Sequence, residues 1–144
     1  MMTNAASVQG AVMVLHFLIV DTDTSAAQVT CALIARAIPE AMVVVAPTFE
    51  HARLSMQGQH LDALIIDPSP HSQEGARLIE QFKATRPDAR VIVVASMPTP
   101  ALRRMMAGLR VDTYLEKPAL LPLLRHELQG LVRDAAPETT TSRT

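Results

Sequence analysis

The heptapeptide LDALIID (residues 61–67) places a carboxylate directly after an unbroken run of four apolar residues. Residues 63–66 are apolar at consecutive positions, as expected of a strand buried on both faces. Strands of this kind belong to parallel sheets that helices cover on both sides. We therefore expect Asp67 to lie at the carboxyl end of a buried parallel strand, which is where such sheets bind their ligands.

Four further apolar runs recur along the chain, at residues 15–20, 42–46, 91–95 and, more weakly, 113–115. The segments between and after the five runs have helical periodicity or helix start and stop signals. They are residues 25–38, 48–57, 75–85, 100–109 and 120–133. Five β-then-α units in series predict an α/β, flavodoxin-like (βα)5 domain, with a doubly wound five-stranded parallel sheet and helices on both faces.

The length of 144 residues fits one domain with a sizeable core. With 49% hydrophobic and 19% charged residues, disorder is not expected for most of the chain. We expect a loose segment at residues 1–13, a single domain at 14–133, and a flexible tail or the start of a linker at 134–144. Such a linker would lead to an effector domain.

The net charge is −1 and there is no block of like charge, so no nucleic-acid or membrane surface is indicated. The apolar stretch at residues 10–20 follows no basic region and contains His16, which favours a strand over a signal peptide or membrane span. The single cysteine, Cys31, fits a reducing compartment, and a cytoplasmic location is expected.

Chemically active side chains follow four of the predicted strands. They are Asp21-Thr22-Asp23, Asp67, Ser96 and Glu116-Lys117-Pro118. Because the carboxyl ends of parallel strands meet at one edge of a sheet, we expect these groups to converge. Clustered carboxylates suit Mg²⁺. A hydroxyl and an ammonium neutralise phosphoryl oxygens, and an aspartate there can itself become an aspartyl phosphate.

These motifs, in this order, resemble the receiver domain of bacterial response regulators over about residues 15–132. LDALIID, ending in Asp67, is similar to the family's stretch leading to the phosphoacceptor. Gly75 matches the glycine of the loop that enters the third helix, and Ser96 the Thr or Ser that closes the fourth strand. Tyr114-Leu115-Glu116-Lys117-Pro118 is similar to the family's aromatic-x-x-Lys-Pro motif, in which the aromatic residue acts as a rotameric switch.

The resemblance implies that Asp67 accepts a phosphoryl group from a sensor histidine kinase or a phosphotransfer protein. Lys117 and the Ser96 hydroxyl would contact the phosphoryl oxygens. The metal implied is Mg²⁺. Its ligands would be Asp21, Asp67 and the backbone carbonyl of Ser69, with the carboxylate of Asp23 as a further candidate.

Ser96 and Tyr114 would form the switch that the resemblance implies. Phosphorylation would draw Ser96 inward, let Tyr114 follow, and remodel the face made by the fourth helix, the fifth strand and the fifth helix. The same face would support a homodimer. The implied protein is a signalling module and not an enzyme, without membrane attachment or direct nucleic-acid binding by this domain.

Three positions depart from the family's pattern. Thr22 stands where the family usually has a second acid, so one usual direct metal ligand is missing. Met97 follows Ser96 where the family usually has a small residue, and would crowd the phosphoryl site. Pro68 follows Asp67 directly, one place earlier than the usual proline.

Two other functions fit parts of the sequence. A receiver-like domain can signal by binding a partner without being phosphorylated. Asp21-Thr22-Asp23 also looks like the opening motif of haloacid-dehalogenase-type phosphatases, with Asp21 as nucleophile and Asp23 as general acid. Ser96 and Lys117 would then stand in for that family's later hydroxyl and lysine. Against the phosphatase, no closing acidic pair follows Lys117 and Asp67 has no role.

Overall fold

The structure, a computed structural model, describes residues 14–117 and 120–135, with the backbone alone for residues 120–123 and 135. The strands are β1 (His16–Val20), β2 (Met42–Ala46), β3 (Ala63–Ile66), β4 (Arg90–Ala95) and β5 (Thr113–Glu116). The helices are α2 (Thr24–Ala37), α3 (Phe49–Met56), α4 (Ser72–Thr85), α5 (Pro100–Leu109) and α6 (Leu120–Ala135). No helix in these ranges is both long and apolar enough to cross a membrane.

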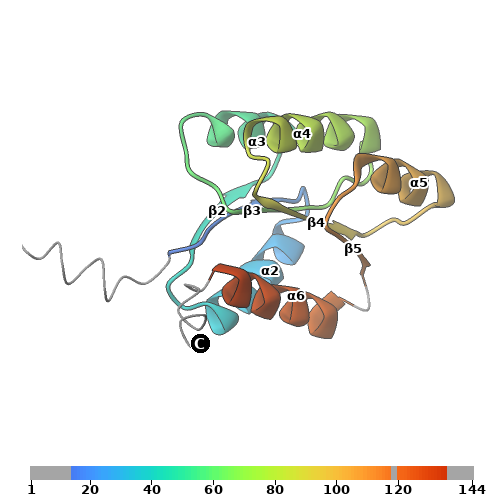
Figure 1. Ribbon diagram of the computed structural model, residues 1–144. Helices are drawn as coiled ribbons and strands as arrows, with labels where there is room; N and C mark the ends of the chain where they lie inside the picture. Colours follow the sequence, from blue (N-terminus) through green and yellow to red (C-terminus); the bar gives the residue numbers. More distant parts are fainter. Residues whose placement is uncertain (1–13, 118–119, 136–144) are drawn as a thin grey trace, which may run out of the picture.

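The five strands form one parallel sheet in the order β2-β1-β3-β4-β5. Helices α3, α4 and α5 cover one face, and α2 and α6 cover the other (Figure 1). The predicted flavodoxin-like (βα)5 fold is therefore confirmed. The order reverses direction after β1, which places a crevice at the carboxyl ends of β1 and β3.

The core follows from the two-residue periodicity of the strands. Alternate residues of β3 enter different layers: Leu64 and Ile66 pack beneath α3, α4 and α5, whereas Ala63 and Ile65 pack against α2 and α6. All four are at most 1% exposed. Burial on both faces explains why the strand is apolar at every position, as the sequence pattern predicted.

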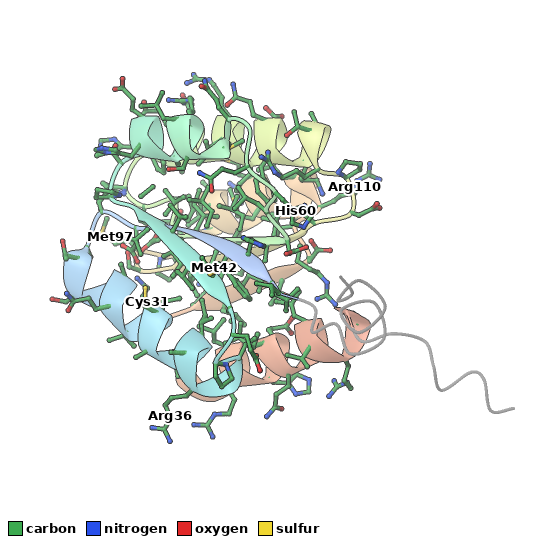
Figure 2. All side chains as sticks on the ribbon, turned by 90° about the vertical axis from the view of Figure 1, so that its left-hand side faces the viewer. Cys31, Arg36, Met42, His60, Met97 and Arg110 are labelled. Carbon is green, nitrogen blue, oxygen red and sulfur yellow. The ribbon has the colours of Figure 1, made fainter. Side chains whose placement is uncertain are left out.

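Strand β2 forms one edge of the sheet, and Figure 2 looks onto this edge with Met42 in view. Met42 and Val45 are 55% and 43% exposed, in contrast to the buried residues of β3. The fully buried strands of the sheet are therefore central ones such as β3, and not the edge strand β2.

Most predicted element boundaries agree with the structure to within one or two residues, but the predicted start of α4 at Gly75 was wrong. The helix begins at Ser72, and its N-cap residue His71 makes no side-chain capping hydrogen bond, so the sequence holds no capping signal there. Gly75 lies in the first turn, where an added Cβ would come within 2.7 Å of the Pro68 Cβ. The glycine thus allows the loop after β3 to pack against α4.

Helix α6 continues to Ala135, two residues past the expected end at Arg133. The expected loose segment at residues 1–13, and residues 136–144 of the expected tail, lie outside the described residues.

Candidate functional site

Three charged residues follow three strands at the same edge of the sheet. The amide of Asp67 donates to the Val20 carbonyl oxygen at 2.9 Å, which continues the β1–β3 ladder one residue beyond the strands. The amide of Lys117 likewise donates to the Ala95 carbonyl oxygen at 3.0 Å. Asp21, which follows β1, is held by a longer bond of 3.3 Å from its amide to the Ala46 carbonyl oxygen. The sheet itself therefore fixes the three backbones.

The three side chains meet in one cluster. Lys117 Nζ lies 3.0 Å from Asp21 Oδ2 and 3.1 Å from Asp67 Oδ2, although the residues are 96 and 50 positions apart in sequence. The side chains of Asp21 and Asp67 are only 5% and 4% exposed, and that of Lys117 is 19% exposed. The predicted convergence of Asp21, Asp67 and Lys117 is thus observed, with one ammonium shared by two buried carboxylates.

Backbone amides satisfy the second oxygen of each carboxylate. Asp67 Oδ1 accepts from the amides of Ser69 at 3.0 Å and Ser96 at 3.4 Å. Asp21 Oδ1 accepts from the amide of Asp23 at 2.9 Å. These bonds give the buried carboxylate oxygens hydrogen-bond partners from the backbone. Both aspartates are therefore oriented from two sides, by amides on Oδ1 and by the ammonium on Oδ2.

Two opposing effects act on the pKa of Lys117. Burial disfavours its charge and acts to lower its pKa, but the hydrogen bonds and charges of Asp21 and Asp67 outweigh burial and raise the pKa of Lys117 above its usual value. Lys117 is consequently cationic at neutral pH. One positive charge against two negative charges leaves the cluster short of positive charge, which suits a site that also binds a cation.

Asp23 and Thr22 lie outside this cluster. The Asp23 carboxylate caps α2 by accepting from the amides of Ser25 and Ala26 at 3.0 and 3.2 Å. Thr22 is exposed. Within residues 14–117 and 120–135 no group of three or more His, Cys, Asp or Glu side chains is arranged to hold a metal ion. The carboxylate ligands available at the cluster are therefore the two of Asp21 and Asp67.

Those two carboxylates still fit Mg²⁺. This ion binds through one or two carboxylates and keeps several of its waters, so it does not need a cage of protein ligands. The backbone carbonyl of Ser69, a residue that is 6% exposed in the loop after Asp67, is a third candidate ligand. A direct acidic ligand from position 22 is missing, as the sequence indicated.

The loop after β4 joins the site through its backbone. The amide of Ser96 points to Asp67, and the amide of Met97 donates to the Ser69 Oγ at 3.3 Å. Ser96 itself is exposed, and its hydroxyl makes no hydrogen bond with the described residues. Met97 is 53% exposed (labelled in Figure 2), so most of this residue is open to solvent and not packed among the carboxylates.

Tyr114 lies away from the carboxylates, on β5. Its ring packs partly against the core beneath α5, and its hydroxyl donates to Glu116 Oε2 at 3.0 Å. Glu116 also binds Arg103 of α5. The sequence analysis missed Arg103. It listed Glu116 among the groups expected to converge at the sheet edge, but Glu116 binds Arg103 and Tyr114 instead.

The phosphatase alternative does not suit this geometry. It requires Asp23 as a general acid, but the Asp23 carboxylate is engaged by the first turn of α2. It also leaves Asp67 idle, whereas Asp67 shares Lys117 with Asp21. The arrangement therefore fits a phosphatase of this type poorly.

No protein-family model and no curated protein matches the sequence. Solved structures do match the fold. A response regulator receiver domain protein from Methanospirillum hungatei JF-1 is 20% identical with a TM-score of 0.70, over 85% of this chain and all of that one. A signal receiver domain from Clostridium thermocellum is 15% identical with a TM-score of 0.75, over 84% of this chain and 99% of that one.

A third match is the signal receiver domain of a DNA-binding response regulator from Colwellia psychrerythraea 34H. It is 21% identical with a TM-score of 0.73, over 83% of this chain and 98% of that domain. Each of these three matches spans nearly the whole of the solved domain, so the similarity covers the complete fold. The chain therefore has the fold of response regulator receiver domains.

Proposed function

We propose that this domain is the receiver of a two-component phosphorelay and that Asp67 is its phosphoacceptor. The observation that carries the proposal is the contact of one lysine ammonium with two buried carboxylates, 3.0 Å from Asp21 and 3.1 Å from Asp67. Buried titratable groups with charged partners are typical of functional sites. In parallel sheets such sites lie beyond the carboxyl ends of the strands. The receiver fold supports the same assignment.

The two oxygens of Asp67 would have different tasks. Oδ1 is held by the amides of Ser69 and Ser96, which orients the carboxylate. Oδ2, which faces Lys117, is the oxygen that would attack the phosphorus atom of an incoming phosphohistidine. A phosphorus–oxygen bond forms to Asp67 while the phosphorus–nitrogen bond of the donor breaks. Lys117 would then move its contact from the carboxylate to a phosphoryl oxygen, and the Ser96 hydroxyl would contact another.

Mg²⁺ would be held by Asp21, Asp67 and the backbone carbonyl of Ser69, and when bound it neutralises charge on the transferring phosphoryl group. Asp21 would bind the ion through Oδ2, because its Oδ1 already accepts from the Asp23 amide. With Thr22 in place of an acid, we expect weak Mg²⁺ binding that depends on the phosphoryl donor for further ligands.

The output surface would be the face made by α5, β5 and α6, which correspond to the fourth helix, fifth strand and fifth helix of the receiver fold. Ser96 lies in the loop that enters α5, and Tyr114 lies on β5, so a change at Asp67 reaches this face through both elements. The partners proposed are a sensor histidine kinase or phosphotransfer protein at the site, and a second copy or an effector at this face.

A second candidate function is that of an interaction module that is not phosphorylated. The exposed Thr22, and the restriction of the cluster to two carboxylates, favour it. In that function Lys117 would hold Asp21 and Asp67 permanently as a structural ion pair, and the α5–β5–α6 face would bind its partner constitutively.

The two functions are separated by incubation with acetyl phosphate and Mg²⁺ followed by intact-mass spectrometry. The proposed receiver gains one phosphoryl group, and Asp67→Asn gains none. Asp21→Asn, which keeps the phosphoacceptor but loses a metal ligand, should be labelled more slowly. Equal masses before and after incubation in the wild-type protein would favour the unphosphorylated module.

A further inference from the structure

A second cluster of charged side chains lies beside the site, and the proposed function does not use it. Glu116, the last residue of β5, accepts from Arg103 of α5 through both oxygens: Nε lies 2.6 Å from Oε2, and Nη2 lies 3.3 Å from Oε1. The Tyr114 hydroxyl donates to the same Oε2 at 3.0 Å. One carboxylate thus links α5 to β5 and also fixes the hydroxyl of the only tyrosine in the chain.

Both ends of this cluster are connected to the carboxylate site. Glu116 directly precedes Lys117, whose ammonium is shared by Asp21 and Asp67. Arg103 lies in the first part of α5, and the loop that leads into α5 donates its Ser96 amide to Asp67. A displacement of Lys117 would act on Glu116, its neighbour in the chain, and a displacement of this loop would act on α5, which carries Arg103.

The electrostatics keep the cluster formed at neutral pH. The hydrogen bond from Arg103 holds the pKa of Glu116 below its usual value, so Glu116 is ionised. Burial, together with the hydrogen bond and charge of Glu116, raises the pKa of Tyr114 above its usual value, so its hydroxyl stays protonated and able to donate.

The cluster is also easily broken. The side chains of Arg103 and Glu116 are 51% and 33% exposed, and exposed ion pairs add little to the stability of a fold. A weak contact between two elements that both lead to the site is suited to reversible switching more than to structural support.

We propose that Arg103 and Glu116 are positioning residues that form a latch with Tyr114. The latch holds the Tyr114 hydroxyl on Glu116 while Lys117 is bound by the two carboxylates, and it opposes rearrangement of α5 and β5. It regulates the site described above and so rests on the proposed function. A contact made in only one of two states shifts the balance between them, and a ligand that favours the other state must overcome it. Loss of the latch therefore increases the affinity of the site for a phosphoryl group.

The test uses beryllofluoride with Mg²⁺ as a phosphoryl mimic and the fluorescence of Tyr114 as reporter, since the chain has one tyrosine and no tryptophan. Arg103→Gln and Glu116→Gln should each bind the mimic about two- to fivefold more tightly than the wild-type protein, as expected for loss of one exposed ion pair. Arg103→Lys keeps the charge but cannot form both bonds, and should give an intermediate affinity.

Arg104→Gln is the matched control. Arg104 is the next residue of α5, is exposed, and takes no part in the ion pairs formed among residues 14–117 and 120–135. Its replacement removes the same charge from the same helix without touching Glu116, so the affinity for the mimic should stay at the wild-type value.

A second readout tests the contact without any ligand. Absorbance titration of Tyr114 should give a lower pKa in Glu116→Gln than in the wild-type protein, because the carboxylate that raises it is gone. An unchanged titration would show that the hydroxyl does not contact Glu116 and would overturn the latch.

The outcomes separate the latch from the function on which it rests. If the wild-type protein binds the mimic through Asp67 and both variants bind it equally tightly or more weakly, the latch is overturned and the receiver function stands. If the wild-type protein gives no Asp67-dependent response, the receiver function fails, and the latch fails with it.

Discussion

Replacing Lys117 with methionine should destabilise the protein far more than the same replacement of Lys83. The substitution keeps the length and apolar stem of the side chain but removes the ammonium that lies 3.0 and 3.1 Å from the two carboxylates. Asp21 and Asp67, at 5% and 4% side-chain exposure, would then face each other's charge without a counter-ion. Removing one partner of a buried ion pair typically costs about 3–5 kcal/mol.

We expect the lower end of that range, about 3 kcal/mol, because Lys117 is 19% exposed and amides continue to hold both Oδ1 atoms. A loss of that size is a large fraction of the ~5–15 kcal/mol that stabilises a typical domain. The measurement is urea unfolding at neutral pH, monitored by far-ultraviolet circular dichroism. We expect a lower unfolding midpoint for the variant and the same slope of the free energy of unfolding against urea concentration.

Lys83 supplies the control, as the only other lysine in the chain. Its ammonium donates to the Arg110 carbonyl oxygen at 3.1 Å in an exposed setting, so Lys83→Met should cost about 1 kcal/mol or less. Adding Asp67→Asn to Lys117→Met should recover part of the loss, since one uncompensated charge is removed. A loss below about 1 kcal/mol for Lys117→Met would refute the reasoning, because it would mean that the carboxylates do not depend on the ammonium.

Three further outcomes are expected. Gly75→Ala should lower the free energy of unfolding by about 1–2 kcal/mol, because the new Cβ meets Pro68 at 2.7 Å. Gly108→Ala, whose new Cβ would have nothing within 4 Å, should raise the free energy of unfolding by about 0.5–1 kcal/mol. Shifts of the urea midpoint in the same direction for both variants would contradict this. Thr22→Asp should strengthen Mg²⁺ binding measured by calorimetry, and an unchanged affinity would argue against a metal site here. The raised pKa of Lys117 means that its stabilising contribution is complete below the unfolded lysine value of about 10.4 and is lost as pH rises through the folded value. Wild-type stability should therefore fall toward that of Lys117→Met at alkaline pH, and a constant difference between the two would count against the contact.

Much of the fold was predictable because burial on both faces leaves a plain pattern in sequence. Residues 63–66 are apolar without interruption since each contacts a helical layer, and the same holds for residues 17–20 of β1 and 91–95 of β4. Once the strands were located, Asp67 and Lys117 had to lie at one edge, because parallel strands end together. Their convergence at that edge was therefore predictable from the sequence alone.

Other features depend on geometry that sequence spacing does not contain. The start of α4 carries no capping side chain, and the role of Gly75 inside that helix follows from where Pro68 happens to pack. Asp23 was a candidate metal ligand, and only the direction of its carboxylate toward the amides of α2 shows that it caps the helix. The sequence therefore did not predict what a side chain contacts where the position of the backbone leaves more than one partner within reach.

The ion pair between Arg103 and Glu116 is the clearest case of a contact that the sequence did not predict. The two residues lie on different elements, and nothing in their separation of 13 positions marks them as partners. Their contact is set by how α5 packs over β5, which depends on core residues such as Met106. A motif can place Glu116 beside Lys117, but the packing of the helix decides what Glu116 binds.

The central claim is that Asp67 is the residue that becomes phosphorylated, and it is tested most directly by locating the modified atom. After incubation with acetyl phosphate and Mg²⁺, borohydride reduces an aspartyl phosphate to homoserine, which tandem mass spectrometry assigns to a single position. We predict homoserine at position 67 in the wild-type protein and no homoserine in Asp67→Asn. Homoserine at Asp21, or at no aspartate, in folded wild-type protein would contradict the claim.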